Sequence, residues 1–582
     1  MALVWLWLCL AIPSGDVLNP EVPISDDDRE LREQVEYLLS HPLDLNRASA
    51  VELQEIPWLS PLLAFRIVEF RDSVGPFDSV AGLRVVPGIS MALYESLVPL
   101  LVLPCNATPG WEGSVLVRCL SDSIPVGQEL GVFGRARVCR GPWTANATIE
   151  KDAGEPSLAD WHGFSLAYAS SPVHVVGGDY TVGSGLGLVF SGPHGALGER
   201  YDQGVSRSTR LRVPSSAQES RVRRGGGLEL FHRGWMALAF GSYRRLDARL
   251  NEDGSIARLR LDGVHDDSAS RAERSRVDEA SGGGAVSYQT GAVQVGAAGG
   301  GVRYDRAFSP SESTGSLAGN RVGFLSLFTE ARPGSYRVQA EGGWSTGGGL
   351  AGAVDLSGRW TAWSVDAGLS AYQADFFAPL GRWRTLTGRR PRAHARALIA
   401  YHHDGLGISV RGNTYRDFDE DSLPAKLEMR VEQRAGRLDI GVLFGWRYRL
   451  ERQRHRMARL DVEYKPVPGI SARLRLEDRY PEEGTGRGLM AGAAVRSRVG
   501  PVRVSLSSAR FVLRGPGVRM YWPEYGPMRV GSGFGTSESC WRFSSGVSLE
   551  LSRDTMIGVR LGCSLVDGME FDFGTQIQIG LS

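Results

Sequence analysis

From Gly113 to the C-terminus, apolar and polar residues alternate along the chain with a period of two. The last segment shows the pattern most clearly. One of its faces carries Phe571, Phe573, Thr575, Ile577, Ile579 and Leu581, and the other carries Asp572, Gly574, Gln576, Gln578, Gly580 and Ser582. Because successive side chains of a strand point to opposite sides of a sheet, the pattern predicts a β-strand with one apolar face. A strand of this length is typical of membrane-spanning barrels.

Two internal hairpins repeat the alternation with charged residues on the polar face. The first covers residues 459–477 and turns at residues 466–469, and the second covers residues 426–448 and turns at Ala435-Gly436. We expect arginines to pair with carboxylates of the neighbouring strand on this polar face. Trp446 and Tyr448, near the end of the second hairpin, suit an aromatic belt at a membrane surface.

Three features separate a membrane barrel from a soluble sheet protein. The strands run to about ten residues or more, longer than the usual five or six of globular sheets. Their polar faces carry charges on consecutive strands, as a water-filled lumen permits. Short turns, such as Pro333-Gly334, Asp404-Gly405 and Gly500-Pro501, alternate with long polar loops, such as 191–224 and 262–278. These features favour an antiparallel transmembrane barrel over residues 113–582. A soluble secreted β-protein, with its apolar faces buried between two sheets, is the alternative.

The length of this region bounds the size of the barrel. At about twenty residues per strand and connection, residues 113–582 would form roughly 22 to 26 strands. A lumen of that width needs a plug or inward-folded loops. The 74 glycines of the 582-residue chain suit its many turns, and a net charge of +1 gives no global sign of a nucleic-acid partner.

The six cysteines form no CxxC pair and have no matching histidine spacing, so a zinc site is not expected. Cys119 and Cys139 could form a disulfide only if their strands are neighbours. His402-His403-Asp404 lies beside a predicted turn, where such residues are ordinary surface groups. The acidic residues 417–421 indicate a solvated loop. With no HExxH motif either, we expect no enzyme activity, no catalytic residue, no metal and no cofactor.

The N-terminal residues lack the alternating pattern of the rest of the chain. Residues 1–15 contain a short apolar run that ends near Pro13, which indicates a secretory signal peptide; a buried N-terminal helix is the alternative. Ser25-Asp26-Asp27-Asp28 is a helix-capping sequence, so residues 25–40 are predicted as a leading helix that Pro42 ends.

Residues 41–104 carry the most specific motif of the chain. Leu43-Asp44-Leu45-Asn46-Arg47-Ala48-Ser49 opens it, and Ser49 with Glu52 forms a capping box for a short helix. A hairpin at 57–60 precedes a second helix, from Pro61 through Arg71. Gly75-Pro76-Phe77 forms a turn after this helix, and a third helix covers 79–85. A second hairpin at 87–90 leads into a fourth helix that ends by Pro99. Over residues 43–103 this resembles the tandem helix-hairpin-helix repeat of the ComEA-type competence proteins.

The resemblance implies contact with a DNA phosphate, made by backbone N–H groups of the hairpins at helix N-termini. The implied DNA-binding residues are Trp58, Leu59, Ser60, Arg66, Arg71, Arg84, Pro87, Gly88, Ile89 and Ser90. The first hairpin has Trp58 and Ser60 where glycines are usual, whereas the second keeps Gly88. Between His41 and Leu103, four basic residues face seven acids, a net charge of −3, whereas phosphate binding depends on cations. A protein-docking role is therefore the alternative.

The segment Val176-Gly177-Gly178-Asp179-Tyr180 and its continuation to Phe190 resembles a G-D-Y-x-x-x-x-G-Q-G-L segment of large helix-hairpin-helix proteins of outer-membrane type. Its glycines predict close packing of backbone or aromatic rings, or a bend in the barrel wall. It is not a nucleotide-binding loop, because no Lys-Ser/Thr follows and no helix is predicted after the strand. The glycine-rich residues 531–535 are not a nucleotide-binding loop either, for the same reasons.

The fold class that follows is α plus all-β: a small tandem helix-hairpin-helix module before a large antiparallel transmembrane β-barrel. The leading hypothesis places the barrel in a bacterial outer membrane, in contact with its lipid, and the module in the periplasm, where it binds the phosphate backbone of double-stranded DNA without sequence preference, during uptake. The alternative is a structural or transport barrel whose module docks a periplasmic protein.

Overall fold

A computed structural model describes residues 38, 43–46, 48, 53, 56, 59, 61–86, 89, 94, 97–103 and 111–581. Within the last range it leaves out residues 122–129, 156, 158–159, 171, 192–209, 215–221, 261–262, 264, 266, 310–318, 334–335, 361, 382–391, 418–424, 450–452, 468, 481–485, 516–517, 525–531, 552–554 and 567. The predicted signal peptide lies outside the described residues, as does the leading helix apart from Leu38.

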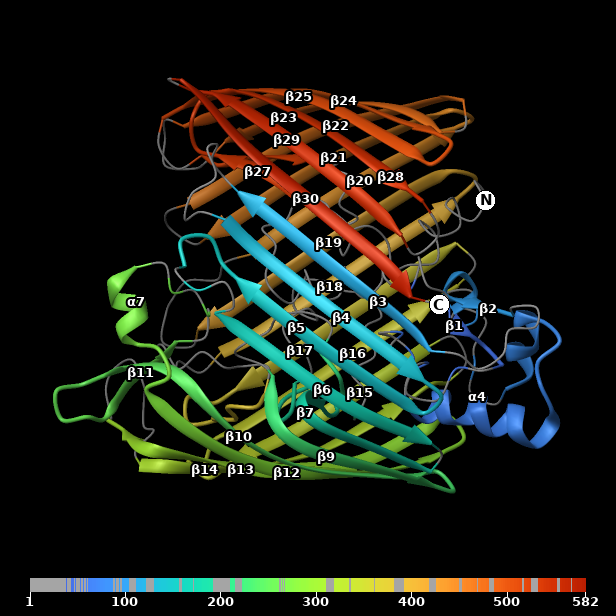
Figure 1. Cartoon of the computed structure of the whole chain (residues 1–582), viewed down its shortest axis with the longest axis vertical. Helices are drawn as coiled ribbons and strands as arrows, with labels where there is room; N and C mark the ends of the chain where they lie inside the picture. Colours follow the sequence, from blue (N-terminus) through green and yellow to red (C-terminus); the bar gives the residue numbers. More distant parts are fainter. Residues whose placement is uncertain are drawn as a thin grey trace.

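Most of the chain forms one closed antiparallel barrel (Figure 1). Over the described residues, 24 strands form its wall. These wall strands are Glu112–Ser121 (β3), Leu130–Arg140 (β4), Trp143–Lys151 (β5), Trp161–Ser170 (β6), Val173–Gly183 (β7), Arg223–His232 (β9), Trp235–Leu250 (β10), Val277–Thr290 (β12), Val293–Phe308 (β13), Gly319–Ala331 (β14), Tyr336–Ser345 (β15), Leu350–Arg359 (β16), Trp363–Tyr372 (β17), Arg392–His403 (β18), Leu406–Asp417 (β19), Ala425–Ala435 (β20), Leu438–Arg449 (β21), Gln453–Val467 (β22), Ile470–Tyr480 (β23), Arg487–Val499 (β24), Val502–Arg514 (β25), Trp541–Glu550 (β28), Met556–Leu565 (β29) and Met569–Leu581 (β30). Pairing of β3 with β30 closes the barrel, with Gly113 opposite Leu581.

The two ends of the barrel differ in their connections. At one end, here called the short-turn end, the longest connection covers residues 551–555, and β3 begins and β30 ends there. The turn at Asp404-Gly405 has φ angles of 46° and 81°, which match the primed turns of tight hairpins. At the other end, the long-loop end, the longest connection covers residues 184–222. The predicted asymmetry of turns and loops is confirmed.

Two predicted loops contain more structure than expected. Within 191–224, Arg210–Arg212 forms a short strand (β8), and β9 begins at Arg223. Within 262–278, a capping box at Asp267 starts the helix Ser268–Ala272 (α7), and β12 begins at Val277. The strand Ile256–Arg260 (β11) extends β10 at the same end. The prediction of plain polar loops was wrong for these pieces.

The outer surface of the wall is apolar and the inner surface is polar. On β23, Leu474 is 58% exposed and Leu476 is 54% exposed. The residues that alternate with them, Arg475 and Glu477, are only 1% and 2% exposed. A sandwich would bury the leucines, so the soluble two-sheet alternative is excluded. Both predicted hairpins are present, and the expected pairs form across strands: Arg459 to Glu477 at 2.7 Å and Arg473 to Asp461 at 2.8 Å.

Aromatic rings lie on the outer surface near both ends of the strands. Trp143, Trp235 and Trp363 are exposed near the short-turn end and pack against Tyr168, Tyr288 and Tyr401 of adjacent strands. Near the long-loop end the exposed rings include Tyr243 and Trp344. Trp235 and Tyr243 are eight residues apart on β10. At about 3.4 Å per residue and a tilt of about 40°, they are about 21 Å apart along the barrel axis, near the ~25 Å apolar band of membrane barrels.

The N-terminal module lies at the short-turn end of the barrel, where Figure 1 shows it in blue. Its described elements are Leu43–Asp44 (β1), Pro61–Val74 (α4), Val80–Val85 (η1), Val98–Leu100 (η2) and Leu101–Val102 (β2), and β1 pairs with β2 in parallel. The helix from Pro61 and the turn at Gly75 match the predictions. The third predicted helix is a 3₁₀ helix that starts at Val80. The predicted helix before the first hairpin, the second hairpin and the fourth helix lie mostly outside the described residues.

A small apolar core holds the module together. It contains Leu45, Leu53, Ile56, Leu59, Leu63, Ile67, Leu83, Val86 and Leu97, all buried. Asn46 ties the opening segment to the turn, because its side chain donates to the carbonyl oxygen of Phe77 and accepts from the Phe77 N–H. In the described part of the chain, no helix has both the length and the apolar character needed to cross a membrane.

Cys119 and Cys139 do lie on neighbouring strands, β3 and β4. Their registers differ, however, since Cys119 is opposite Val132 and Cys139 is opposite Glu112. Both thiols are free, as are those of Cys540 and Cys563.

Candidate functional site: a latched segment in the lumen

Strand β7 leaves the barrel wall at the segment that the sequence marked by its glycines. Its pairing with β6 ends at Gly178 and its pairing with β9 ends at Tyr180, after which Thr181–Gly183 pairs with β8 instead. Gly178 has a φ of +91°, and a Cβ there would lie 2.2 Å from the carbonyl oxygen of Phe164. Only glycine fits this bend. Residues 179–191, whose side chains are buried throughout, and β8 are called here the lumen segment.

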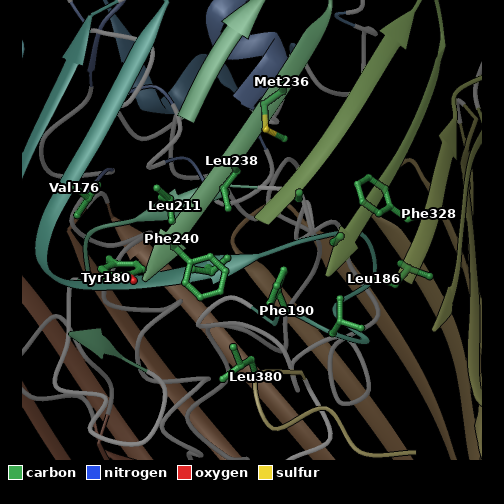
Figure 2. Packing of buried hydrophobic residues seen from close by; sticks show 14 of the residues in the cluster. Val176, Tyr180, Leu186, Phe190, Leu211, Met236, Leu238, Phe240, Phe328 and Leu380 are labelled. Carbon is green, nitrogen blue, oxygen red and sulfur yellow. The ribbon is translucent and has the colours of Figure 1, made fainter. Parts of the chain in front are cut away.

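Phe190 anchors the lumen segment on the inner wall (Figure 2). Its ring packs edge-on against Phe240 of β10 at 5.1 Å and against Phe324 of β14 at 5.7 Å. Gly283 of β12 and Gly300 of β13 lie between these two strands. A Cβ on Gly283 would lie 2.8 Å from the tip of the Phe190 ring, and a Cβ on Gly300 would lie 3.2 Å from it. The glycines of the wall therefore form the seat of this ring.

Glu341 of β15 holds the turn of the lumen segment. One of its carboxylate oxygens accepts the backbone N–H groups of Leu186 at 2.6 Å and of Leu188 at 3.1 Å. The carboxyl group is buried. Gly185 has a φ of +50°, and a Cβ on it would lie 2.9 Å from the same carboxylate. Hydrogen bonds to a buried charge are stronger than neutral ones, so Glu341 works as a latch.

A second buried carboxylate holds β8. Glu229 of β9 accepts the backbone N–H of Leu211, and its other oxygen lies 2.6 Å from Nδ1 of His174 on β7. Further along, the side-chain amide of Asn146 on β5 donates to the carbonyl oxygen of Pro214 at 2.8 Å. Wall strands on both sides of β7 thus fix the returning part of the connection inside the barrel.

The connection between β17 and β18 packs against the same segment. Phe376, Phe377 and Leu380 are buried in one apolar cluster with Leu186, Leu188 and Phe190. The backbone N–H of Ser191 donates to the carbonyl oxygen of Leu380 at 2.9 Å. Two connections from the long-loop end therefore fold inward and pack together over the wall of β10 and β12–β15, which agrees with the expectation that so wide a lumen needs inward-folded loops.

The lumen segment also reaches the N-terminal module. Arg210 of β8 is buried, and its guanidinium donates to the carbonyl oxygen of Leu59 at 3.4 Å. Leu59 is the fully buried residue of the first predicted hairpin, and the apolar cores of the module and of the lumen segment belong to one cluster. Leu59 is therefore in contact with the lumen segment.

The structure separates the predicted DNA-binding residues. Arg71 donates to the carbonyl oxygens of Leu45 and Ala48 inside the module. Arg66 is half-buried on α4, and Arg84 is exposed, with its guanidinium over the ring of Tyr94. Ile89 is half-buried, and its N–H donates to Val86. Trp58, Ser60, Pro87, Gly88 and Ser90 lie outside the residues whose side chains are described.

A second inward insertion covers the wall near β24–β29. The hairpin of Met520–Glu524 (β26) and Ser532–Thr536 (β27) places Trp522 without exposed surface against Gly492 of β24, where a Cβ would lie 2.2 Å from the indole. Glu524 is paired with Arg542 and Arg560, which also pair with Asp572 of β30. These four charges balance, so the insertion is held without a net buried charge.

A buried ionic group joins the connections at the long-loop end. His265 lies 2.8 Å from Asp160 through Nδ1 and 2.8 Å from Asp247 through Nε2, and Glu155 accepts its backbone N–H. Burial raises the pKa of the Glu155 carboxyl, although the backbone N–H groups of Asp152 and His265 oppose the rise. The donor atoms of Glu155, Asp160 and His265 lie within 4.8 Å of one another. Because Asp160 also pairs with Arg274 and both histidine nitrogens have carboxylate partners, the group acts as an ionic tie between loops.

The match to a protein-family model agrees with the assignment of the N-terminal module. A helix-hairpin-helix motif model matches residues 40–102. Among solved structures, the chain is similar to the translocation pore of the P pilus usher PapC, at 12% identity and a TM-score of 0.40, over 81% of this chain and 99% of that one. It is also similar to the siderophore receptor PirA from Acinetobacter baumannii, at 7% identity and a TM-score of 0.40, over 83% and 82% of the two chains.

No curated protein matches the chain. The predicted likeness to ComEA-type competence proteins stays a prediction. The described residues and the motif match together identify the chain as a helix-hairpin-helix module followed by a closed 24-strand β-barrel.

Proposed function

We propose that the protein is a gated pore of a bacterial outer membrane. The exposed apolar wall with aromatic rings at both strand ends suits lipid contact. By the usual orientation of such barrels, the short-turn end and the N-terminal module lie in the periplasm. The lumen segment closes the pore in its resting state.

The proposal rests on one observation: two carboxylates of the barrel wall accept hydrogen bonds from the backbone of the lumen segment. Glu341 and Glu229 accept backbone N–H groups of Leu186, Leu188 and Leu211. A segment bonded through its backbone to a few wall side chains can be released as a unit when those bonds break. A fixed filler would need no such charged contacts, because apolar packing alone would hold it.

The module is the element placed to trigger release. The hydrogen bond from Arg210 to Leu59 connects β8 to the first hairpin, so a periplasmic protein that pulls on the module also pulls on the lumen segment. This favours the docking role of the module, with a periplasmic protein as partner.

Electrical recordings in planar lipid bilayers test the proposal. We expect the native protein to show low, rare conductance and the Glu341→Ala variant to open frequently, while the fold, followed by heat-modifiable gel mobility, stays intact. Heat-modifiable migration in both proteins with no conductance in either would overturn the gated pore.

Binding of DNA by the module is the second candidate function, and the exposure of Arg84 beside the second hairpin favours it. Since Leu59 of the first hairpin contacts β8, we propose the second hairpin as the one that meets a phosphate. Full-length protein in detergent should then shift duplex DNA at low salt, and Arg84→Glu should weaken the shift severalfold. Equal shifts for both proteins at every salt concentration would remove this candidate.

A further inference from the structure

One sector of the barrel wall carries an excess of positive charge on its lumen face. The outer face of β19–β25 is apolar, with Leu427, Leu460, Leu474 and Leu506 exposed, so the residues that alternate with them face inward. Among the residues that the structure describes, twelve basic residues and seven acids form ion pairs on this inner face and at the adjoining end of β28, and their formal charges sum to +5. The basic residues are Arg411, Lys426, Arg430, Arg434, Arg459, Lys465, Arg473, Arg475, Arg479, Arg496, Arg498 and Arg503, and the acids are Glu428, Glu432, Asp439, Asp461, Glu463, Glu477 and Glu550. We call this set the basic sector.

The excess arises because most acids of the basic sector are shared between two basic residues. Asp461 pairs with Arg473 at 2.8 Å and with Arg475 at 2.7 Å. Glu550 pairs in the same way with Arg498 at 3.0 Å and with Arg503 at 2.6 Å. In the group of Glu550, one carboxylate neutralises one of the two guanidinium groups, so this group keeps a positive charge.

The basic side chains of the sector are also more exposed to the lumen than the acidic ones. Seven basic residues of the sector keep 34–47% of their side chains exposed, whereas six of the seven acids keep 28% or less. A solute in the lumen therefore meets the cations first. The described part of the lumen segment packs on the other wall, β10 and β12–β15, and Figure 1 shows β12–β14 and β20–β25 at opposite sides of the barrel.

From this arrangement we propose that the basic sector makes the open lumen selective for anionic solutes, those that carry phosphate or carboxylate groups. This inference rests on the proposed pore and names its substrate class. A narrow aqueous path along a wall of one charge sign concentrates counter-ions and excludes ions of the same sign. Arginine forks, in addition, fit the oxygens of phosphate and carboxylate groups.

The test measures the reversal potential of the opened pore in a potassium chloride gradient, in the Glu341→Ala background. We expect chloride to be more permeant than potassium. Replacement of Arg496, Arg498 and Arg503 by glutamine lowers the charge of the sector from +5 to +2 and should reduce the chloride-to-potassium permeability ratio about twofold or more at low salt. Arg487→Gln with Arg510→Gln is the control, since both residues lie on the same strands, β24 and β25, but on the outer face with Leu489 and Leu506.

Conductance without anion preference, or an equal fall in the permeability ratio for control and test variants, would overturn the inference and leave the pore standing. The absence of conductance in every variant would overturn the pore and the inference together. A preference for chloride that only the inner-face substitutions reduce supports the basic sector as the path of anions.

Discussion

The strength of the Glu341 latch can be worked out from its two hydrogen bonds. A hydrogen bond to a charged group contributes about 1.5–3 kcal/mol, and a neutral one about 0.5–1.5 kcal/mol. In Glu341→Gln the amide oxygen can still accept the N–H groups of Leu186 and Leu188, so each bond loses about 1 kcal/mol and the closed state about 2 kcal/mol. Since 1.4 kcal/mol is a factor of ten, the ratio of open to closed pores should rise about 30-fold.

The assay is the open probability of single pores in planar bilayers, with dye efflux from liposomes as the ensemble measurement. Glu330→Gln is the matched control, because Glu330 is a half-buried carboxylate of the neighbouring strand β14 whose partners, Arg332, Arg337 and Gln339, lie on β15 or in the turn before it. The control should leave the open probability unchanged. An open probability that falls or stays constant in Glu341→Gln would show that burying the carboxylate costs more than its two bonds return, and the latch would be refuted.

Three further substitutions test other parts of the structure. Phe190→Ala removes the ring that packs on Gly283 and Gly300 and should destabilise the closed state by about 3–5 kcal/mol. We expect a protease to cleave the lumen segment of this variant while the barrel stays intact. Resistance equal to that of the native protein would show that the Phe190 ring does not hold the segment. His265→Ala removes the ring that joins Asp160 to Asp247 and should destabilise the long-loop end by about 1–3 kcal/mol, measured as faster hydrogen exchange in residues 152–160 but not in β23. Leu474→Arg places a charge on the lipid face and should lower barrel stability in lipid by about 2–4 kcal/mol, measured by urea unfolding in vesicles; an equal effect from Leu474→Ala would count against lipid contact there.

The wall of the barrel was predictable because each of its strands meets two different environments. Residues such as Leu474 and Arg475 must alternate when one face is apolar and the other polar, so the period of two and the ion pairs of β22 and β23 were readable in the sequence. The lumen segment lacks such a signal, because residues 184–191 are buried on all sides and follow no period. Its glycines still predicted a bend, which Gly178 confirms.

The functional contacts were harder to predict for a different reason. In the sequence, Glu341 and Glu229 occupy inward positions of alternating strands, as many wall acids do, and nothing local separates a latch from a wall ion pair. What distinguishes them is the partner, a backbone N–H group of a segment 153–155 residues away in the case of Glu341. Long-range contacts of this kind depend on how the barrel closes, and a single sequence does not carry that information.

The position of the first hairpin explains why its sequence departs from the DNA-binding pattern. Glycines in such a hairpin serve to bring a phosphate close to the backbone. Here Leu59 of the first hairpin is fully buried, and its carbonyl oxygen accepts from Arg210 of β8. A hairpin that packs on protein needs apolar surface and a backbone acceptor rather than exposed N–H groups. A module with a net charge of −3 also has little attraction for phosphate, but it can approach the basic guanidinium of Arg210 and remain docked at the mouth of the barrel.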